Sequence, residues 1–184
     1  MNDSLSLFSI HRVVWTALMA ALTAVGGIIA IPVGPISPVP ITLQTMFVVL
    51  AGFILGPRGG AFAMVLYMIA GILGLPVFAG GKAGLAVFMG PTGGFLLGFI
   101  PAAIFCGFAK SDPVKPFVVL FLFAALATAL TLFLGTIQLS AVLKISVYKA
   151  MAIGVFPYLP GAVIKCAGAA FIYRFLAVRR LLPL

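Results

Sequence analysis

Long apolar runs, separated by short clusters of proline, glycine or charged residues, cover almost the whole chain. A helix that crosses a bilayer needs roughly 20 mostly apolar residues, because the hydrocarbon core is about 30 Å thick. The runs predict six such helices, at residues 13–31, 42–55, 61–75, 92–110, 117–140 and 160–178. The pattern therefore predicts an all-α, polytopic membrane protein, with one integral membrane domain over residues 1–184 built as a six-transmembrane-helix bundle.

Composition supports this fold class. Of the 184 residues, 64% are hydrophobic and only 7% are charged. Soluble globular domains carry about 25% charged residues, because water must wet their surface. Lipid is therefore the expected main solvent of this chain, and we expect it in the cell membrane.

The net charge of +9 has a simple topological explanation. A nucleic-acid-binding protein gathers its Lys and Arg on one face, whereas here they occur mostly singly between apolar runs, so nucleic acid is not an expected partner. Six crossings place both termini on one side, together with seven basic residues: Arg12, Arg58, Lys110, Lys115, Arg174, Arg179 and Arg180. The opposite side holds three: Lys82, Lys144 and Lys149. Because cytoplasmic loops are enriched in Lys and Arg, both termini are predicted to be cytoplasmic.

Residues that could perform catalysis are scarce. The only acids are Asp3 and Asp112, there is no Glu, and the single His11 precedes the first apolar run. General acid–base catalysis requires a positioned proton carrier, so no catalytic residue is expected. Cys106 and Cys166 lack the spacing of a metal or redox motif. Gly81-Lys82-Ala83 lacks the remaining residues of a phosphate-binding loop, and we predict no enzyme activity, metal, cofactor or ATP site.

Three connections on the predicted outer side are long and rich in proline or glycine: 32–40, 76–91 and 141–159. Loops of this kind are where binding sites are often built. Irregular backbone at membrane depth is tolerated only where it is buried in protein or lines a cavity. Because the helices at 42–55 and 61–75 are short, we expect an outer loop to dip into the membrane and form a pocket for a small solute.

Lys165 is the most informative single residue. It lies about five residues into the last helix, hence roughly 7–8 Å below its start, and a cation at membrane depth costs on the order of 2.5–3.5 kcal/mol. Either the long side chain reaches back to the interface, or the ammonium meets a ligand. Position alone does not separate the two, but the helices contain no acid to pair with Lys165, which favours an anionic or polar solute.

A few other polar and small residues each allow two interpretations of their role. Thr42 and Gln44 begin a helix, where they cap it or contact a solute. Tyr67 and Tyr158 are either interfacial anchors or walls of an apolar pocket. Small residues four apart permit close helix packing, internally or against a partner. In the first helix these are Ala17, Ala20, Ala21 and Ala24.

Five segments together resemble the biotin-specific substrate-binding (S) components of energy-coupling-factor (ECF) transporters, the BioY family. These segments span nearly the whole chain, and the Gly-Leu-Pro-Val-Phe and Gly-Pro-Thr-Gly-Gly blocks are the more specific ones. The segments are Pro38-Val-Pro-Ile-Thr-Leu-Gln-Thr45, Leu55-Gly-Pro-Arg-Gly-Gly60, Tyr67-x-x-x-Gly-x-x-Gly-Leu-Pro-Val-Phe78, Met89-Gly-Pro-Thr-Gly-Gly-Phe-Leu-x-Gly-Phe99 and Phe156-Pro-Tyr-Leu-Pro-Gly-Ala-Val-Ile-Lys165.

The resemblance implies a six-helix bundle with an outward-facing biotin pocket, covered by the loops after the first and third helices. It implies that the alanine rows dock on a membrane scaffold subunit powered by two ATPase subunits, with self-association as the alternative. In the implied pocket, Lys165 attracts a polar or anionic end, Gln44 and the loop of Gly80, Gly81 and Lys82 supply donors, and Tyr67, Phe78 and Tyr158 pack the apolar body.

One position departs from the family pattern. The family commonly has an Asp directly after Pro-Gly, and here that position is Ala162 while Lys165 is present. Without the carboxylate, Lys165 is expected to attract an anionic ligand more strongly. The first hypothesis is therefore the high-affinity capture of biotin for import. The alternatives are an S component for another vitamin or precursor, and a membrane scaffold protein that transports nothing; biotin binding separates them.

Overall fold

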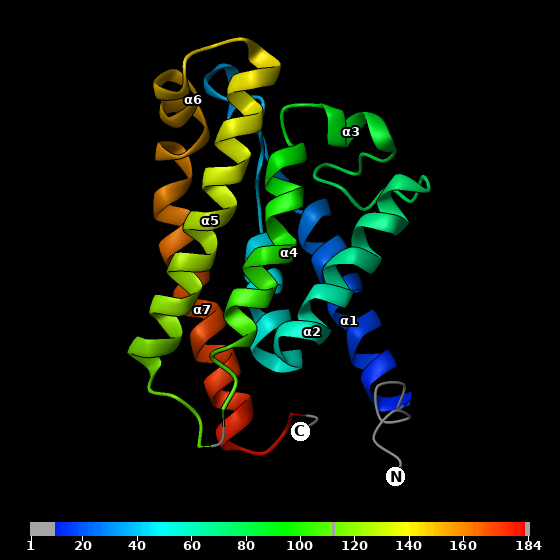
Figure 1. Ribbon diagram of the computed structural model, residues 1–184, viewed down its shortest axis with the longest axis vertical. Coiled ribbons are helices and arrows are strands. Elements are labelled where there is room, and N and C mark those ends of the chain that lie inside the picture. The colour runs from blue at the N-terminus through cyan, green and yellow to red at the C-terminus, as the bar shows by residue number, and fades with distance from the viewer. Residues whose placement is uncertain (1–9, 112, 183–184) are drawn as a thin grey trace.

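The computed structural model describes residues 10–111 and 113–182, and Asp3 and Asp112 lie outside these ranges. The fold is a bundle of tilted helices with very little sheet (Figure 1). The elements, in chain order, are α1 (Ile10–Ile28), β1 (Ala30–Ile31), η2 (Gly34–Ile36), β2 (Ile41–Thr42), α2 (Gln44–Ile72), α3 (Leu85–Met89), α4 (Gly93–Gly107), α5 (Phe117–Leu143), α6 (Val147–Gly154), η3 (Phe156–Tyr158) and α7 (Leu159–Val178).

The long helix α2 is folded back on itself at its middle. Gly56 has a φ of 76° and a ψ of −179°, which interrupts the helix, and glycine adopts such a conformation without steric cost. Pro57 follows and needs no hydrogen-bond partner for its nitrogen. The two halves pack closely, because a Cβ at Gly60 would lie 3.0 Å from the Cα of Gly52.

The kink in α2 is shorter than the turn predicted from the sequence. Two helices at 42–55 and 61–75 were predicted with a turn between them, whereas helical structure resumes directly after Gly56 and ends at Ile72. The turn is thus a single residue, since Pro57 can start a helix as readily as it ends one. The ends of the other helices lie within a few residues of the predicted ones, and the predicted start of α5 and end of α7 match the structure.

The six-transmembrane-helix prediction is confirmed in outline. α1, the two halves of α2, α4, α5 and α7 are the six crossing segments. Four helical stretches are long and apolar enough to span a membrane, and the 15-residue α4 is a shorter apolar helix. Large apolar side chains are exposed around the bundle, including Phe133 at 62% and Ile164 at 73%. Such a surface is suited to lipid rather than water.

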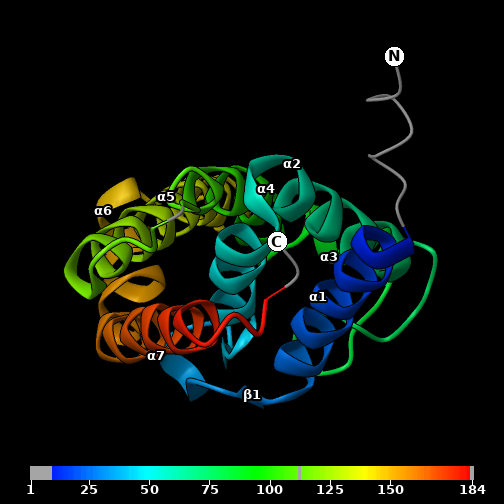
Figure 2. The same ribbon diagram turned by 90° about the horizontal axis from the view of Figure 1, so that it is seen from below.

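The two ends of the bundle differ in structure. The start of α1, the kink of α2 and the end of α7 lie at one end, drawn at the bottom of Figure 1. The opposite end carries the two-stranded β1–β2 ladder, α3 and α6. β1 and β2 are antiparallel, with Ala30 opposite Thr42 and Ile31 opposite Ile41. The Pro-rich connection is thereby held as a short hairpin along one side of the bundle, between α1 and α7 (Figure 2).

The connection at 141–159 is more ordered than the sequence suggested. α5 continues to Leu143 and stops at Lys144, which takes the left-handed conformation with a φ of 52°. α6 then follows, and its N-cap Ser146 accepts a hydrogen bond from the backbone N–H of Lys149. This short helix packs on α5, with Ala150 buried completely. It positions η3 and the start of α7 beside the Pro-rich hairpin.

The alanine rows of α1 separate into two faces. Ala20 is buried at 7% exposure and Ala24 is partly buried against the core, so both contact the chain's own helices. Ala17 and Ala21 are exposed. Of the four alanines, only Ala17 and Ala21 are therefore accessible to a docking partner.

Candidate ligand-binding cavity

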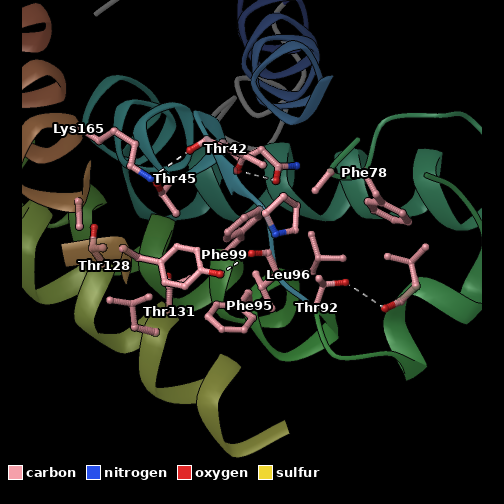
Figure 3. Close-up of a pocket in the computed structure, with 18 of the residues that line it drawn as sticks. Thr42, Thr45, Phe78, Thr92, Phe95, Leu96, Phe99, Thr128, Thr131 and Lys165 are labelled. Atoms are coloured by element: carbon pink, nitrogen blue, oxygen red, sulfur yellow. Dashed lines mark hydrogen bonds between the residues drawn. The ribbon is translucent and has the colours of Figure 1, made fainter. Parts of the chain in front are cut away.

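A cavity opens between the helices at the end of the bundle that carries the β1–β2 ladder, α3 and α6 (Figure 3). It encloses about 770 Å³ free of atoms, its open mouth included. Its wall comes from the hairpin before α2, the first turn of α2, the loop after α2, and helices α4, α5 and α7. These segments are far apart in the sequence, and the bundle brings them together at the end where the sequence predicted a solute pocket.

The body of the cavity is apolar. Phe95, Leu96 and Phe99 project from α4, Val39 comes from the Pro-rich hairpin, and Leu132 comes from α5. Leu96, Phe99 and Val39 are all at most 7% exposed, so they form a fixed wall. A cavity of this kind takes the apolar part of a small molecule and leaves orientation to a few polar groups.

Lys165 places its ammonium group in this cavity. The residue lies in the second turn of α7, and its Nζ donates a hydrogen bond of 3.0 Å to the backbone carbonyl of Thr42 (Figure 3). The alternative in which Lys165 reaches back to the interface through lipid is therefore not what the structure shows. No described residue carries a carboxylate side chain. The ammonium has two further protons, so it can also donate to a ligand.

A chain of hydrogen bonds continues from Thr42 away from the cavity. The Thr42 hydroxyl donates to Oε1 of Gln44 over 3.1 Å, and Nε2 of Gln44 donates to the hydroxyl of Tyr67. The Tyr67 hydroxyl donates to the carbonyl of Val77 over 3.2 Å. Gln44 lines the cavity, whereas Tyr67 lies behind it and is 1% exposed. Tyr67 is thus a support for Gln44 and for the loop after α2, not a wall residue.

Tyr158 fixes the other side of the hairpin. Its hydroxyl hydrogen bonds with the carbonyl of Val39 and lies 2.9 Å from Oγ of Ser37. The ring lines the cavity and is 7% exposed. The Pro-rich hairpin is therefore held at two points, by Tyr158 of η3 and by Lys165 of α7.

The loop between α2 and α3 covers the cavity from the opposite side. Phe78 lines the cavity and is fully buried, in edge-to-face contact with Tyr67 and with Phe88. Its backbone N–H donates to the carbonyl of Lys82 over 3.0 Å, which closes a tight turn. Nε2 of Gln138 on α5 donates to the carbonyl of Phe88 over 2.6 Å and so ties α3 to the bundle.

The structure does not bring Gly80 and Gly81 into the cavity. Both have a φ of 73° at the tip of this turn. The N–H of Gly80 donates to the carbonyl of Gly27, and the N–H of Gly81 donates to the carbonyl of Phe78, each over 2.9 Å. Gly80 and Gly81 were expected to donate hydrogen bonds to a ligand. In this conformation their N–H groups instead stabilise the turn. Lys82, the third residue of the turn, is exposed and lines the cavity mouth.

The two lysines of the cavity lie on different sides of it. Lys165 and Phe78 are on opposite sides in Figure 3, and Lys82 is bonded to Phe78 through the backbone. The cavity thus has the Lys165 ammonium group on one side, the loop that carries Lys82 on the other, and apolar side chains in its wall. This arrangement suits an elongated solute with a polar group at each end.

Several wall residues were not anticipated from the sequence. Thr45 lies beside Lys165 in Figure 3, and its hydroxyl is buried without a hydrogen-bond partner among the described residues. Thr128 and Thr131 on α5 also line the cavity. Polar residues in an otherwise apolar membrane helix often mark a functional site. Thr128 and Thr131 could therefore have been proposed from the sequence. The described residues contain no group of His, Cys, Asp and Glu that could hold a metal ion.

Comparison with known proteins gives a consistent result. The family model described as the BioY family matches residues 1–183. A probable biotin transporter BioY of Pyrococcus horikoshii is 36% identical over 156 residues, which is 85% of this chain and 90% of that protein. The biotin transporter BioY of Thermotoga maritima is 36% identical over 167 residues, covering 88% and 93% of the two chains.

A solved structure has the same fold. The crystal structure of an S component for biotin from an ECF-type ABC transporter superposes with a TM-score of 0.85. It is 28% identical in sequence, and the alignment covers 96% of this chain and 94% of that one. The arrangement of crossing helices described above is thus shared along almost the full length of both proteins.

Proposed function

The chain belongs to the BioY family, a family of membrane transporters rather than enzymes, and we propose on this basis that it captures biotin as the substrate-binding component of an ECF-type vitamin importer. Relatives named biotin transporters cover most of the chain, and the matching crystal structure is that of a biotin S component. The outer cavity is the proposed site of capture.

One observation supports this site most strongly. The cavity has the ammonium group of Lys165 on one side, the loop residue Lys82 in its lining on the side of Phe78, and the rings of Phe95 and Phe99 in its apolar wall. Biotin has a ureido ring at one end, a carboxylate at the other, and an apolar sulfur ring and hydrocarbon chain in the middle. Both the ureido oxygen and the carboxylate accept hydrogen bonds from an ammonium group, and charge-assisted bonds of this kind are the stronger ones.

The proposed import requires partner subunits. The sequence has no phosphate-binding loop and no acid within the crossing helices that could carry a proton relay, so energy must come from elsewhere. We propose a membrane scaffold subunit with two ATPase subunits, docked on the face of α1 that carries Ala17 and Ala21. Small exposed residues four apart let a second helix approach closely. Self-association through the same face is the competing arrangement.

Uptake of labelled biotin tests this function. The chain is expressed in biotin-requiring cells that lack their own biotin importer, with and without a co-expressed scaffold and ATPase module. We expect biotin to accumulate in the cells when the module is present. A chain that inserts into the membrane but gives no cell-associated biotin in either case would overturn the proposal and favour a scaffold role.

The Thr45 hydroxyl, which has no partner among the described residues, leads to a prediction in which stability is kept or raised while biotin affinity falls. Valine has nearly the same shape, so Thr45→Val removes a buried polar atom that has no hydrogen-bond partner within residues 10–111 and 113–182. We expect the ligand-free protein to unfold at an equal or higher temperature. If biotin accepts or donates a bond there, its affinity falls by about 2- to 13-fold, the usual effect of one hydrogen bond.

Thr16→Val is the matched control, because the Thr16 hydroxyl bonds only to the carbonyl of Arg12 at the far end of α1. It should leave biotin affinity unchanged. A Thr45→Val protein with unchanged affinity would remove Thr45 from the site.

Orientation in the membrane is a separate proposal. We expect the cavity to face outward and both termini to be cytoplasmic, since seven basic residues lie on the side of the termini and three on the other. Single cysteines at positions 82 and 113, in a chain whose buried Cys106 and Cys166 are replaced by alanine, report this. An impermeant maleimide added to intact cells should label position 82 and not position 113; the reverse pattern would contradict the orientation.

A further inference from the structure

A second concave surface lies at the opposite end of the bundle, away from the cavity. It is an open groove formed where α2 is kinked and α4 ends. Phe62 and Phe108 border it at 68% and 62% exposure, and Val65 and Ile104 complete its apolar wall. In a membrane protein, exposed apolar side chains such as these are suited to contact with acyl chains.

Arg58 is the only charged residue that lines this groove. It follows Pro57 directly at the kink and is exposed. Within residues 10–111 and 113–182 it has no hydrogen bond through its side chain and no carboxylate to pair with. A guanidinium group presents a planar fork of donors that matches a phosphate. The groove therefore has an apolar length and a phosphate-binding end, the same division as in a phospholipid.

The surroundings reinforce the attraction of an anion. The Cδ of Lys110 lies close to the kink, 3.7 Å from the position that a Cβ at Gly56 would take. Burial is the main cause that lowers the pKa of the Lys110 ammonium, and the crowding of a second positive charge, that of Arg12, contributes less. Such crowding is relieved by a negative headgroup. This end also carries most of the basic residues of the chain.

We propose that the groove is a binding site for an anionic phospholipid of the surrounding leaflet, with Arg58 on the lipid phosphate and the acyl chain along Phe62 and Phe108. The site is distinct from the biotin cavity and does not depend on it. It selects the lipid by charge: phosphatidylglycerol meets Arg58 with an unneutralised phosphate, whereas the choline group of phosphatidylcholine carries a competing positive charge.

A fluorescence reporter can be placed in the groove itself. The chain has a single tryptophan, so Trp15→Phe with Phe62→Trp gives one emitter at the groove wall. The protein is reconstituted into vesicles of equal parts phosphatidylglycerol and phosphatidylcholine, with bromine atoms, which quench tryptophan, on the acyl chains of one lipid or the other. The difference in quenching gives the relative affinity of the groove for the two lipids.

We expect phosphatidylglycerol to be preferred by about fivefold, the effect of one basic residue at a charged membrane surface. Arg58→Gln should bring the ratio close to one, Arg58→Lys should retain much of it, and Arg174→Gln, a matched change on α7 outside the groove, should leave it unchanged. Three results would overturn the proposal: no preference in the parent protein, an equal loss in Arg174→Gln, or an emitter that neither lipid quenches because a second copy of the chain covers the groove.

Discussion

Replacing Lys165 by methionine is expected to weaken biotin binding by about 10- to 100-fold, because a hydrogen bond to a charged group contributes about 1.5–3 kcal/mol. Methionine keeps most of the apolar stem and removes only the ammonium. The amine now donates to the Thr42 carbonyl from within the cavity. Its loss removes both this anchor of the hairpin and the donor offered to the ligand.

The measurement is equilibrium binding of labelled biotin to purified protein. Lys149→Met is the control, because Lys149 lies on α6 outside the cavity wall and its removal should leave the affinity unchanged. Lys165→Met with normal affinity, in a protein that unfolds at the normal temperature, would exclude Lys165 from the site. An equal loss in the Lys149 variant would point to a general charge effect instead.

Placing a methyl group on Gly71 is expected to impair the cavity from behind its wall. A Cβ there would overlap three carbon atoms of the Phe78 ring. Phe78 is fully buried and lines the cavity, so the ring and its loop must move. Overpacking of this kind typically costs about 1–3 kcal/mol. We expect Gly71→Ala to unfold at a lower temperature and to bind biotin at least several-fold more weakly.

Two further variants separate crowding from a general effect of alanine in a helix. At Gly161, a Cβ meets no atom within 4 Å, so Gly161→Ala should have normal stability and affinity. Gly71→Ala combined with Phe78→Leu should recover part of the lost stability, because leucine leaves room for the methyl group. If the double variant is less stable than both single variants, the contact between these residues is not the cause.

The crossing helices were predictable because lipid imposes a long apolar run on each of them. The kink at Gly56 was recognised as a break, yet its extent was not, since Pro57 is equally able to start a helix. α6 was missed because its eight residues are too few to show a clear helical period within a polar connection. The N-cap Ser146 was the available local signal.

The site was predicted less completely than the fold. Lys165, Gln44, Phe78, Lys82 and Tyr158 all line the cavity, and their residue types and the family resemblance pointed to them. Tyr67 was predicted to line the cavity but lies behind Gln44. The sequence does not show which face of α2 points into the cavity. The amides of Gly80 and Gly81 are used in the turn they form, which depends on a tertiary contact with Gly27.

Ala162 is the cavity residue at which this chain departs from the family pattern. It lines the cavity three residues before Lys165 on the same helix, so residues at the two positions lie on one face. An aspartate there, as the family commonly has, would lie beside the ammonium group and neutralise it. In this chain the ammonium has no such neighbour, and the cavity attracts anionic and strongly polar groups more than it would with the acid.

Equilibrium binding of biotin to the detergent-purified protein decides whether the cavity is a biotin site. We expect saturable binding of one biotin per chain, which excess unlabelled biotin displaces and which is weakened when Lys165 is replaced by methionine. A protein that unfolds cooperatively on heating but shows no saturable biotin binding would contradict the assignment of the outer cavity as a biotin site.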